Sequence, residues 1–400
     1  MRINRPPVSA GIDILLAAPP AWKVKKIGLV TNHAAVTSQF HPFRIALLEA
    51  GFNLVKLFSP EHGLTICGAD GQPMQDGQDT LTGLPVISLY GPRLAPARED
   101  LEDLDLILFD IPDIGSRFYT YLWTMTYVME ACASCNKPFV VADRPNPLSG
   151  NFGLVEGPLL DELSCSSFIG RWRMPIRHSC TLGELAIYFS AIRKINAPPE
   201  VIPCKNWSRS MFYPDWSPSF VPTSPAIPDF ESALLYPGLC LLEATNLSEG
   251  RGTSTPFRVA GAPWMQAEET ARLFNKIVGN GRQESVYARP VDFTPTEGKY
   301  ALQKCRGIML HIRDHHAFHP VRTGWLLIRL IKDLHPGLFE WAAYPTQVNP
   351  SGKKHLDLLT GLPDAERLFE SDPAGMFSEI KKYTSAGQWQ DMIRPYLLYS

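Results

Sequence analysis

The segment from Phe109 to Tyr121, FDIPDIGSRFYTY, is the densest group of side chains in this chain that could do chemistry. The apolar run Leu106–Phe109, which is typical of a buried strand, ends where this segment begins. The polar stretch that follows holds two acids, one arginine and two tyrosines: Asp110, Asp113, Arg117, Tyr119 and Tyr121. In open α/β sheets, ligands bind beyond the carboxyl ends of the strands, so these side chains are candidate substrate-binding residues.

Two glutamates occupy comparable positions elsewhere. Glu61 follows the apolar run Leu54–Phe58, and Glu249 lies in the glycine-containing stretch TNLSEGRGT. Glycoside hydrolysis needs one carboxyl group that holds a proton and a second that is ionised at the same pH. We therefore predict Glu61 as the general acid and Glu249 as its base, nucleophile or electrostatic partner.

Further polar side chains follow other apolar runs and complete the predicted substrate site. They are Asn32, His62, Asp143, Arg144, Asn146, Asn246 and Arg251. An arginine can form a two-pronged hydrogen bond to a substrate carboxylate, and Arg117, Arg144 and Arg251 are the candidates for that contact. We rank Arg251 first because glycines flank it. Tyr119, Tyr121 and Trp123 alternate, so on an extended segment they would share one face and could pack against a sugar ring.

Several familiar site signatures are missing from the sequence. It has no phosphate-binding P-loop, no dinucleotide-binding glycine pattern, no serine-hydrolase elbow and no HExxH zinc motif. Cys132 and Cys135 form an isolated CxxC in a predicted helix, and the histidines between 311 and 319 have a spacing that is only weakly typical of a metal site. We expect neither a cofactor nor a metal.

Composition narrows the class of partner. The formal net charge of −2 is spread along the chain, which gives no basic surface for nucleic acid. No stretch approaches the roughly 20 apolar residues that cross a bilayer. The short apolar run after the basic amino terminus is broken by Asp13 and ends at Pro19, which is unlike a signal peptide. The eight cysteines are scattered. We expect a cytoplasmic protein that binds a small molecule; its oligomeric state stays open.

The spacing of apolar residues predicts the strands and helices that hold these side chains. Five runs are typical of buried strands: Ile27–Val30, Leu54–Phe58, Val86–Leu89, Leu106–Phe109 and Phe139–Ala142. Helical patterns such as Phe43–Ala50 and Leu122–Ala133 lie between several of them. This alternation predicts the α/β class, with a Rossmann-like parallel sheet that collects the polar clusters at one edge.

A proline-rich stretch, Phe220–Phe230, divides the chain. Prolines at this density stiffen a segment and stop helices, so we predict domains 1–225 and 226–400. The second part shows a helical pattern at Ala267–Val278, a strand at Gly307–Ile312 and a helix at Val321–Leu334. It is predicted to be a smaller α+β domain that completes the cleft.

The motifs reached so far resemble, in order, those of the NamZ-type exo-β-N-acetylmuramidases. The resemblance rests on the segments Leu29–Asn32, Phe58–Gly63, Ser88–Gly91, Phe109–Tyr121, Asp143–Pro147, Val155–Pro158, Thr181–Leu185 and Thr245–Phe257. It implies a Rossmann-like domain without a dinucleotide, an active cleft between two domains, and release of N-acetylmuramic acid from the non-reducing end of peptidoglycan fragments. The absence of a clear signal peptide, where many relatives are exported, favours recycling of imported fragments.

Three alternatives stay open. Family members commonly have Gln where this chain has Pro112, which motivates a non-hydrolytic protein that binds muramyl sugars on the same scaffold. A deacetylase or amidase acting on wall fragments would need a metal ion. Within the glycosidase hypothesis, the 2-acetamido group of the sugar could itself be the nucleophile.

Overall fold

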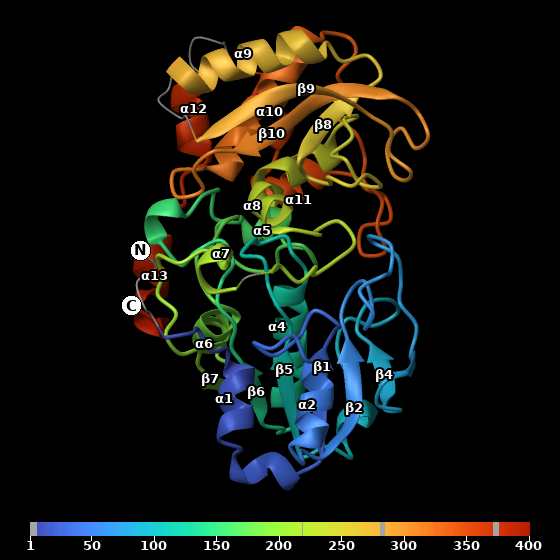
Figure 1. Cartoon of the computed structure of the whole chain (residues 1–400), viewed down its shortest axis with the longest axis vertical. Coiled ribbons are helices and arrows are strands. Elements are labelled where there is room, and N and C mark those ends of the chain that lie inside the picture. The colour runs from blue at the N-terminus through green and yellow to red at the C-terminus, as the bar shows by residue number, and fades with distance from the viewer. Residues whose placement is uncertain (1–5, 218, 281–284, 371–375) are drawn as a thin grey trace.

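A computed structural model describes residues 6–217, 219–280, 285–370 and 376–400. Its larger part is a seven-stranded sheet with strand order β3-β4-β2-β1-β5-β6-β7. Figure 1 shows this sheet in the lower half of the molecule and a smaller three-stranded sheet above it. The predicted fold class, a Rossmann-like parallel sheet followed by a smaller α+β part, is confirmed.

The strands of the large sheet are short and mostly buried. Their bounds are β1 Ile27–Thr31, β2 Leu54–Ser59, β3 Gly77–Gln78, β4 Pro85–Ser88, β5 Leu106–Asp110, β6 Phe139–Ala142 and β7 Glu200–Ile202. All neighbouring strands are parallel except β3 and β4. The polar clusters predicted after the strands therefore lie along the same edge. β1 pairs with β2 on one side and with β5 on the other. The order in which successive strands are added to the sheet therefore reverses between β1 and β5.

Helices cover both faces of this sheet. Those of the first half are α1 Gly11–Ala17, α2 Phe43–Glu49, α3 Arg98–Leu101, α4 Tyr121–Ser134, α5 Glu162–Cys165, α6 Leu182–Ile192 and α7 Tyr213–Trp216. Successive strand residues point to opposite faces, so Leu29 packs in the core that holds α1 and α2. Its neighbour Val30 packs in the core that holds α4 and α6. A sheet buried on both faces explains the continuous apolar runs in the sequence.

The second half contains an antiparallel sheet in the order β8-β10-β9. Its elements are α8 Phe230–Leu239, β8 Val259–Ala262, α9 Ala267–Asn280, β9 Val286–Phe293, β10 Cys305–Ile312, α10 Pro320–Leu334, α11 His355–Thr360, α12 Met376–Tyr383 and α13 Trp389–Ile393, with the short 3₁₀ turn η3 at Cys240–Ala244. Helices α8 and α10 approach closely at two glycines. A Cβ added to Gly238 would lie 2.0 Å from the carbonyl oxygen of Pro320, and one added to Gly324 would lie 2.2 Å from that of Gly238.

Buried arginines tie the two halves together. Arg117 donates hydrogen bonds to the carbonyl oxygens of Pro158 and Met174 in the first half and of Leu359 in the second. Arg177 likewise joins the carbonyls of Leu148 and Phe318. The predicted boundary between 225 and 226 thus separates segments that are in tight contact.

The carboxyl-terminal residues pack against the first half, where α13 lies in Figure 1. The Trp389 indole donates to the carbonyl of His178, and the Tyr399 hydroxyl donates to Asp143 at 2.6 Å. The last segment of the chain therefore belongs spatially with the large sheet.

One local expectation was wrong. Tyr121 and Trp123 lie in α4 rather than on an extended segment, so the three rings do not share one face. The Tyr121 ring still contacts that of Tyr119, with ring centres 4.7 Å apart. Trp123 packs in the core against Trp172 and Phe189, because helical geometry turns it away from the strand-end edge. None of the helices within the described residues has both the length and the apolar character needed to cross a membrane.

Candidate active site

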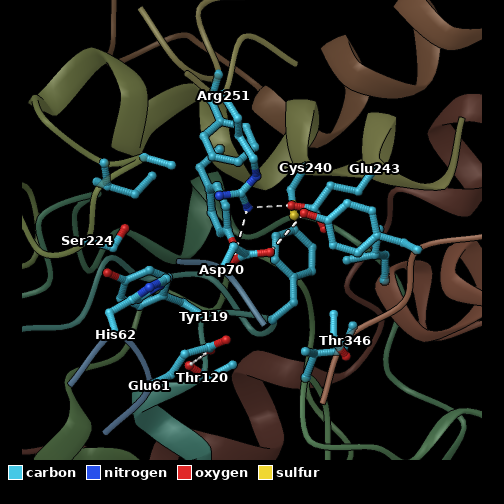
Figure 2. Close-up of a pocket in the computed structure, with 18 of the residues that line it drawn as sticks. Glu61, His62, Asp70, Tyr119, Thr120, Ser224, Cys240, Glu243, Arg251 and Thr346 are labelled. Atoms are coloured by element: carbon cyan, nitrogen blue, oxygen red, sulfur yellow. Dashed lines mark hydrogen bonds and ion pairs between the residues drawn. The ribbon is translucent and has the colours of Figure 1, made fainter. Parts of the chain in front are cut away.

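A cavity with about 580 Å³ of space between its walls lies where the strand-end loops of the large sheet meet the second half of the chain. Its walls come from seven parts of the sequence. They are the loop after β2, Tyr90 after β4, the loop before α4, Ile169 between α5 and α6, the proline-rich stretch, the α8–β8 region, and α11 with the segment that leads into it. Figure 2 shows side chains from these parts converging on one space. The proline-rich stretch predicted as a linker thus forms a wall of the cavity.

Glu61 lies at this cavity and is only 6 % exposed. One carboxyl oxygen accepts the Thr120 hydroxyl at 2.7 Å, and the other accepts the backbone N–H of Gly71 at 3.1 Å. Burial raises the pKa of Glu61 above its ordinary value, although His62 and the two hydrogen bonds act in the opposite direction. The Tyr90 phenol is also nearby, and burial together with Glu61 raises its pKa, so it remains neutral. Glu61 can therefore hold a proton at a higher pH than a solvated glutamate.

Asp70 and His62 lie beside Glu61. Each of the three offers one atom that lies within 4.8 Å of those of the other two. The Nδ1 of His62 donates to the carbonyl of Gly68 at 2.8 Å, which fixes the orientation of the ring. Asp70 accepts the Tyr344 hydroxyl at 2.8 Å. A second carboxylate is thus available next to the buried Glu61.

Arg251 brings positive charge to the same cavity. Its Nη2 lies 2.7 Å from Glu243 and 3.3 Å from Asp70, contacts drawn as dashed lines in Figure 2. Burial alone would raise the pKa of Glu243, but Arg251 and His355, the latter 3.0 Å away, lower it to about 2. Glu243 is therefore an anion at neutral pH, and it holds Arg251 in place against the cavity.

Glu249, the second predicted catalytic residue, is not among the residues that line the cavity. Its carboxylate lies 3.4 Å from Arg251 and 3.3 Å from Lys299, and its side chain is only 3 % exposed. This position behind Arg251 suits a residue that orients the guanidinium. The glycine-containing loop brings Glu249 near the site without exposing its carboxylate to it.

Of the other predicted residues, His62, Tyr119 and Arg251 line the cavity. The remaining ones make contacts elsewhere. Asp110 is fully buried and paired with Arg144, and Asp143 accepts a hydrogen bond from the Tyr399 hydroxyl. The others bind the backbone: Arg117 donates to three carbonyl oxygens, and Tyr121, Asn146 and Asn246 donate to the carbonyls of Thr223, Cys180 and Leu338. The Asn32 side chain accepts the backbone N–H of Ala34. Asp113 and Arg144 line a separate cavity.

Sequence reasoning missed several residues of the cavity wall. They are Asp70, Tyr90, Thr120, Ser224, Glu243, Tyr344 and His355. Asp70 lies nine positions after Glu61 in a loop with several glycines, which was a usable signal. Tyr344 and His355 come from a segment more than 270 positions away from Glu61, and nothing local in the sequence connects them with it.

The arrangement suits acid–base chemistry on a small polar ligand. It offers a buried carboxyl group with raised pKa, a carboxylate beside it and a guanidinium. The trio Glu61, His62 and Asp70 is also the one group of potential metal ligands found in the described part of the chain. A metal ion would need the ionised form of Glu61, whereas burial raises the pKa of this carboxyl group and favours its protonated form.

Comparisons with known proteins identify the family of the chain. Two family models match nearly the whole chain: Exo-beta-N-acetylmuramidase NamZ, N-terminal, over residues 27–231, and its C-terminal counterpart over residues 234–399. The peptidoglycan beta-N-acetylmuramidase NamZ of Bacillus subtilis is 41% identical over 340 residues, which are 84% of this chain and 80% of that protein.

Two crystal structures of DUF1343 family proteins from Bacteroides fragilis share the fold. One has a TM-score of 0.85 at 29% identity and the other a TM-score of 0.75 at 28% identity. In each comparison the match covers 98% of this chain and 99% of the other. From these matches and the site they accompany, we conclude that the chain belongs to the NamZ family of exo-β-N-acetylmuramidases.

Proposed function

We propose that this protein is an exo-acting glycoside hydrolase that releases N-acetylmuramic acid from the non-reducing end of peptidoglycan fragments. The observation that carries the proposal is the buried Glu61 at the cavity, with a raised pKa and a second carboxylate beside it. Membership of the NamZ family supports the same substrate and reaction.

Glu61 is assigned as the general acid. A glycosidic oxygen must be protonated as its bond breaks, and a carboxyl group that keeps its proton near neutral pH can deliver it. The Thr120 hydroxyl and the Gly71 N–H fix the orientation of that carboxyl group. When Glu61 has given up its proton, the same two donors stabilise the carboxylate, so that it can next act as a base.

Asp70 replaces Glu249 as the partner that we favour. Its closest oxygen lies within 4.8 Å of that of Glu61, whereas Glu249 lies outside the cavity wall. Retaining glycosidases separate their two carboxyl groups by about 5–5.5 Å and inverting ones by about 6.5–9.5 Å. The short separation favours net retention, with Asp70 acting as the nucleophile or orienting the 2-acetamido group.

Selectivity for the lactyl ether is assigned to Arg251. N-Acetylmuramic acid differs from N-acetylglucosamine by a lactyl group with one carboxylate, and its recognition requires a cation. Of the three arginines considered, Arg251 lines this cavity, Arg117 is engaged by backbone carbonyls and Arg144 lines a different cavity. Its Nη1 makes no hydrogen bond within the described residues and is free for that carboxylate.

The test compares a chromogenic N-acetylmuramide with its N-acetylglucosaminide counterpart. The protein should release the chromophore from the first and much less from the second, and Asp70→Asn should reduce turnover by about 10²–10⁴. NMR of the first-formed anomer should show retention. No release from the muramide over long incubation would refute the hydrolase, and calorimetric binding of N-acetylmuramic acid in that case would support the non-hydrolytic alternative.

The motivation for that alternative, Pro112, falls outside the site. Pro112 lines the separate cavity and is not part of the wall around Glu61. A metal-dependent deacetylase or amidase would have to use the trio of Glu61, His62 and Asp70. Full activity after treatment with a chelator would exclude this reaction class.

We also infer that the protein works in the cytoplasm on imported fragments. All eight cysteines are free thiols, and Cys67 is exposed. Exposed thiols of this kind are typical of a reducing compartment. Fractionation of the producing cell with an antibody tests this inference, and recovery of the protein outside the cytoplasmic fraction would contradict it.

A further inference from the structure

A second cavity lies at the carboxyl edge of the large sheet, separate from the one around Glu61. It has about 800 Å³ of space between its walls. Its wall includes Val36 after β1, Asp113 after β5 and Arg144 after β6, together with Tyr213, Trp216 and Phe220. These six residues define the switch-point cavity, because it lies where the chain order of the sheet reverses between β1 and β5. Open α/β sheets bind ligands at that point.

The switch-point cavity has a polar part with unused hydrogen-bonding capacity. The Asp113 side chain is 8 % exposed; its Oδ2 accepts the Gly115 N–H at 2.8 Å and lies 3.5 Å from His178. Its buried Oδ1 has no hydrogen-bond partner within the described residues. Asp113 lines both this cavity and a smaller neighbouring one that includes Asn146 and Cys180, and its Oδ1 is an acceptor that no described protein group uses. Buried polar atoms are nearly always paired, so this oxygen is unusual.

Arg144 supplies the complementary donor. Its Nη2 lies 2.9 Å from Asp110 and 2.9 Å from the carbonyl of Val36, and its Nε also binds Asp110. Its Nη1 makes no hydrogen bond within the described residues, and the side chain is 16 % exposed. The cavity wall thus offers both an acceptor and a donor that protein groups do not use.

The apolar part of the cavity is aromatic. The ring centre of Tyr213 lies 4.3 Å from that of Trp216 and 4.8 Å from that of Phe220, so the three rings form one cluster. Aromatic faces of this kind pack against the C–H faces of sugar rings as well as against apolar groups. A ligand for this cavity therefore combines an apolar face with groups that both donate and accept hydrogen bonds.

The local charge excludes two ligand classes. Asp110 already balances Arg144, while Asp13 and Asp113 add two further carboxylates to the wall. Arg144 is the one arginine or lysine that the described residues contribute to this wall, whereas Arg251 has Lys299 beside a carboxylate that both contact, so a phosphate or carboxylate is repelled here but not at Arg251. The residues after β1 also lack the glycine pattern that binds dinucleotides. An ammonium group would suit the carboxylates but could not accept a hydrogen bond from Arg144.

We propose that the switch-point cavity binds a neutral pyranose sugar, with its hydroxyls on Asp113 and Arg144 and one ring face on the aromatic cluster. This site is distinct from the active site. The two cavities lie on either side of the proline-rich stretch, since Thr223 lines the switch-point cavity and Ser224 lines the cavity around Glu61. The Tyr119 hydroxyl, which donates to Thr223 at 2.7 Å, belongs to the partition between them.

The test is saturation-transfer NMR on the full chain with N-acetylglucosamine as the probe. Two variants alter different parts of the switch-point cavity. Val36→Phe fills part of its space, and Trp216→Ala removes one ring of the aromatic cluster. Leu163→Phe is the matched control, because Leu163 is 99% exposed and lies on neither cavity wall. Thermal unfolding checks that each variant is folded.

We expect wild-type and Leu163→Phe protein to bind the probe, and Val36→Phe and Trp216→Ala to bind it at least about tenfold more weakly. An excess of N-acetylmuramic acid, which fills the active site, should leave the signal in place because its carboxylate is repelled from the switch-point cavity. Three results would each overturn the proposal. They are no binding of the probe to the wild-type protein, binding by both cavity variants as strong as that of the wild type, and complete displacement of the probe by N-acetylmuramic acid. Turnover is not needed for this test, so failure of the proposed hydrolase would be seen separately.

Discussion

The loop after β2 and the glycine-containing loop before β8 each bury one glutamate, but they surround it differently. Glu61 accepts hydrogen bonds from a hydroxyl and a backbone amide, both of which are neutral. Glu249 lies between two cations, with Arg251 at 3.4 Å and Lys299 at 3.3 Å. Neutral donors allow a buried carboxyl group to remain protonated, whereas paired cations engage a carboxylate in a structural network.

A glutamate that follows a strand or lies beside a glycine is therefore not a catalytic group on the strength of its position in the sequence alone. Both residues look equivalent along the chain, one after a strand and one directly before a glycine. Their roles are separated by partners far away in sequence, since Thr120 lies 59 positions from Glu61 and Lys299 lies 50 positions from Glu249. Four experiments test whether Glu61 and Glu249 have these different roles.

The largest effect is expected for Glu61→Gln. The amide keeps the shape and hydrogen bonding of the side chain but cannot deliver a proton, so turnover of a chromogenic N-acetylmuramide should fall by about 10²–10⁴. Calorimetry should show that N-acetylmuramic acid still binds. Wild-type turnover in a folded Glu61→Gln protein would remove this residue from catalysis.

Glu249→Gln is the matched substitution and should give the opposite pattern. It removes the negative charge between Arg251 and Lys299, so the free energy of unfolding should fall by roughly 1.5–3 kcal/mol, as for hydrogen bonds to charged groups. Turnover at saturating substrate should stay within about threefold of wild type. Denaturant unfolding and steady-state kinetics measure the two quantities. A loss of turnover as large as that of Glu61→Gln would end the distinction between the loops.

Arg251→Lys tests whether Arg251, which contacts Glu249 and lines the cavity around Glu61, also binds the lactyl carboxylate of the substrate. Lysine keeps the charge but loses the planar, two-pronged donor arrangement. The preference for the muramide over the glucosaminide, taken as a ratio of kcat/KM values, should weaken by about 1–3 kcal/mol. If Arg251→Lys and Arg251→Ala both retain the full preference, the arginine is structural and the lactyl group is read elsewhere.

The smallest effect concerns pH. Because burial raises the pKa of Glu61, the alkaline limb of kcat/KM should lie above the pH at which a solvated glutamate titrates. The Thr120 hydroxyl bonds to the carboxylate and lowers that pKa, so Thr120→Val should move the limb to higher pH with little change in the plateau. Thr126→Val, at another buried threonine of α4 that does not touch Glu61, is the control. Movement of the limb to lower pH would contradict the assignment.

Much of the fold could be predicted because it is encoded locally. The apolar runs Ile27–Val30, Leu54–Phe58 and Phe139–Ala142 correspond to β1, β2 and β6, and the helix predicted at Val321–Leu334 corresponds to α10. Strands buried on both faces need continuous apolar runs, and helices need apolar residues at helical spacing. The parallel order then placed Glu61 at the edge of the sheet.

The site could be predicted only in part, because most of its contacts join distant segments. Asp70 reaches Tyr344 across 274 positions, and Glu243 reaches His355 across 112. Arg117 shows the converse: an arginine in a promising loop is turned inward, where three backbone carbonyls accept its hydrogen bonds. Backbone acceptors leave no trace in the side-chain sequence, so no motif could have revealed this.

The same contacts of Arg117 bear on how the protein can change over evolutionary time. Carbonyl oxygens are present whatever the side chain, so substitutions at Pro158, Met174 and Leu359 leave the acceptors unaltered provided that the backbone path is kept. An insertion or deletion that moves one of these carbonyls would instead strand a buried guanidinium. Substitutions at these three positions should therefore be tolerated, whereas insertions and deletions near them should not. Neither half can be exchanged for a foreign domain without also replacing the arginine.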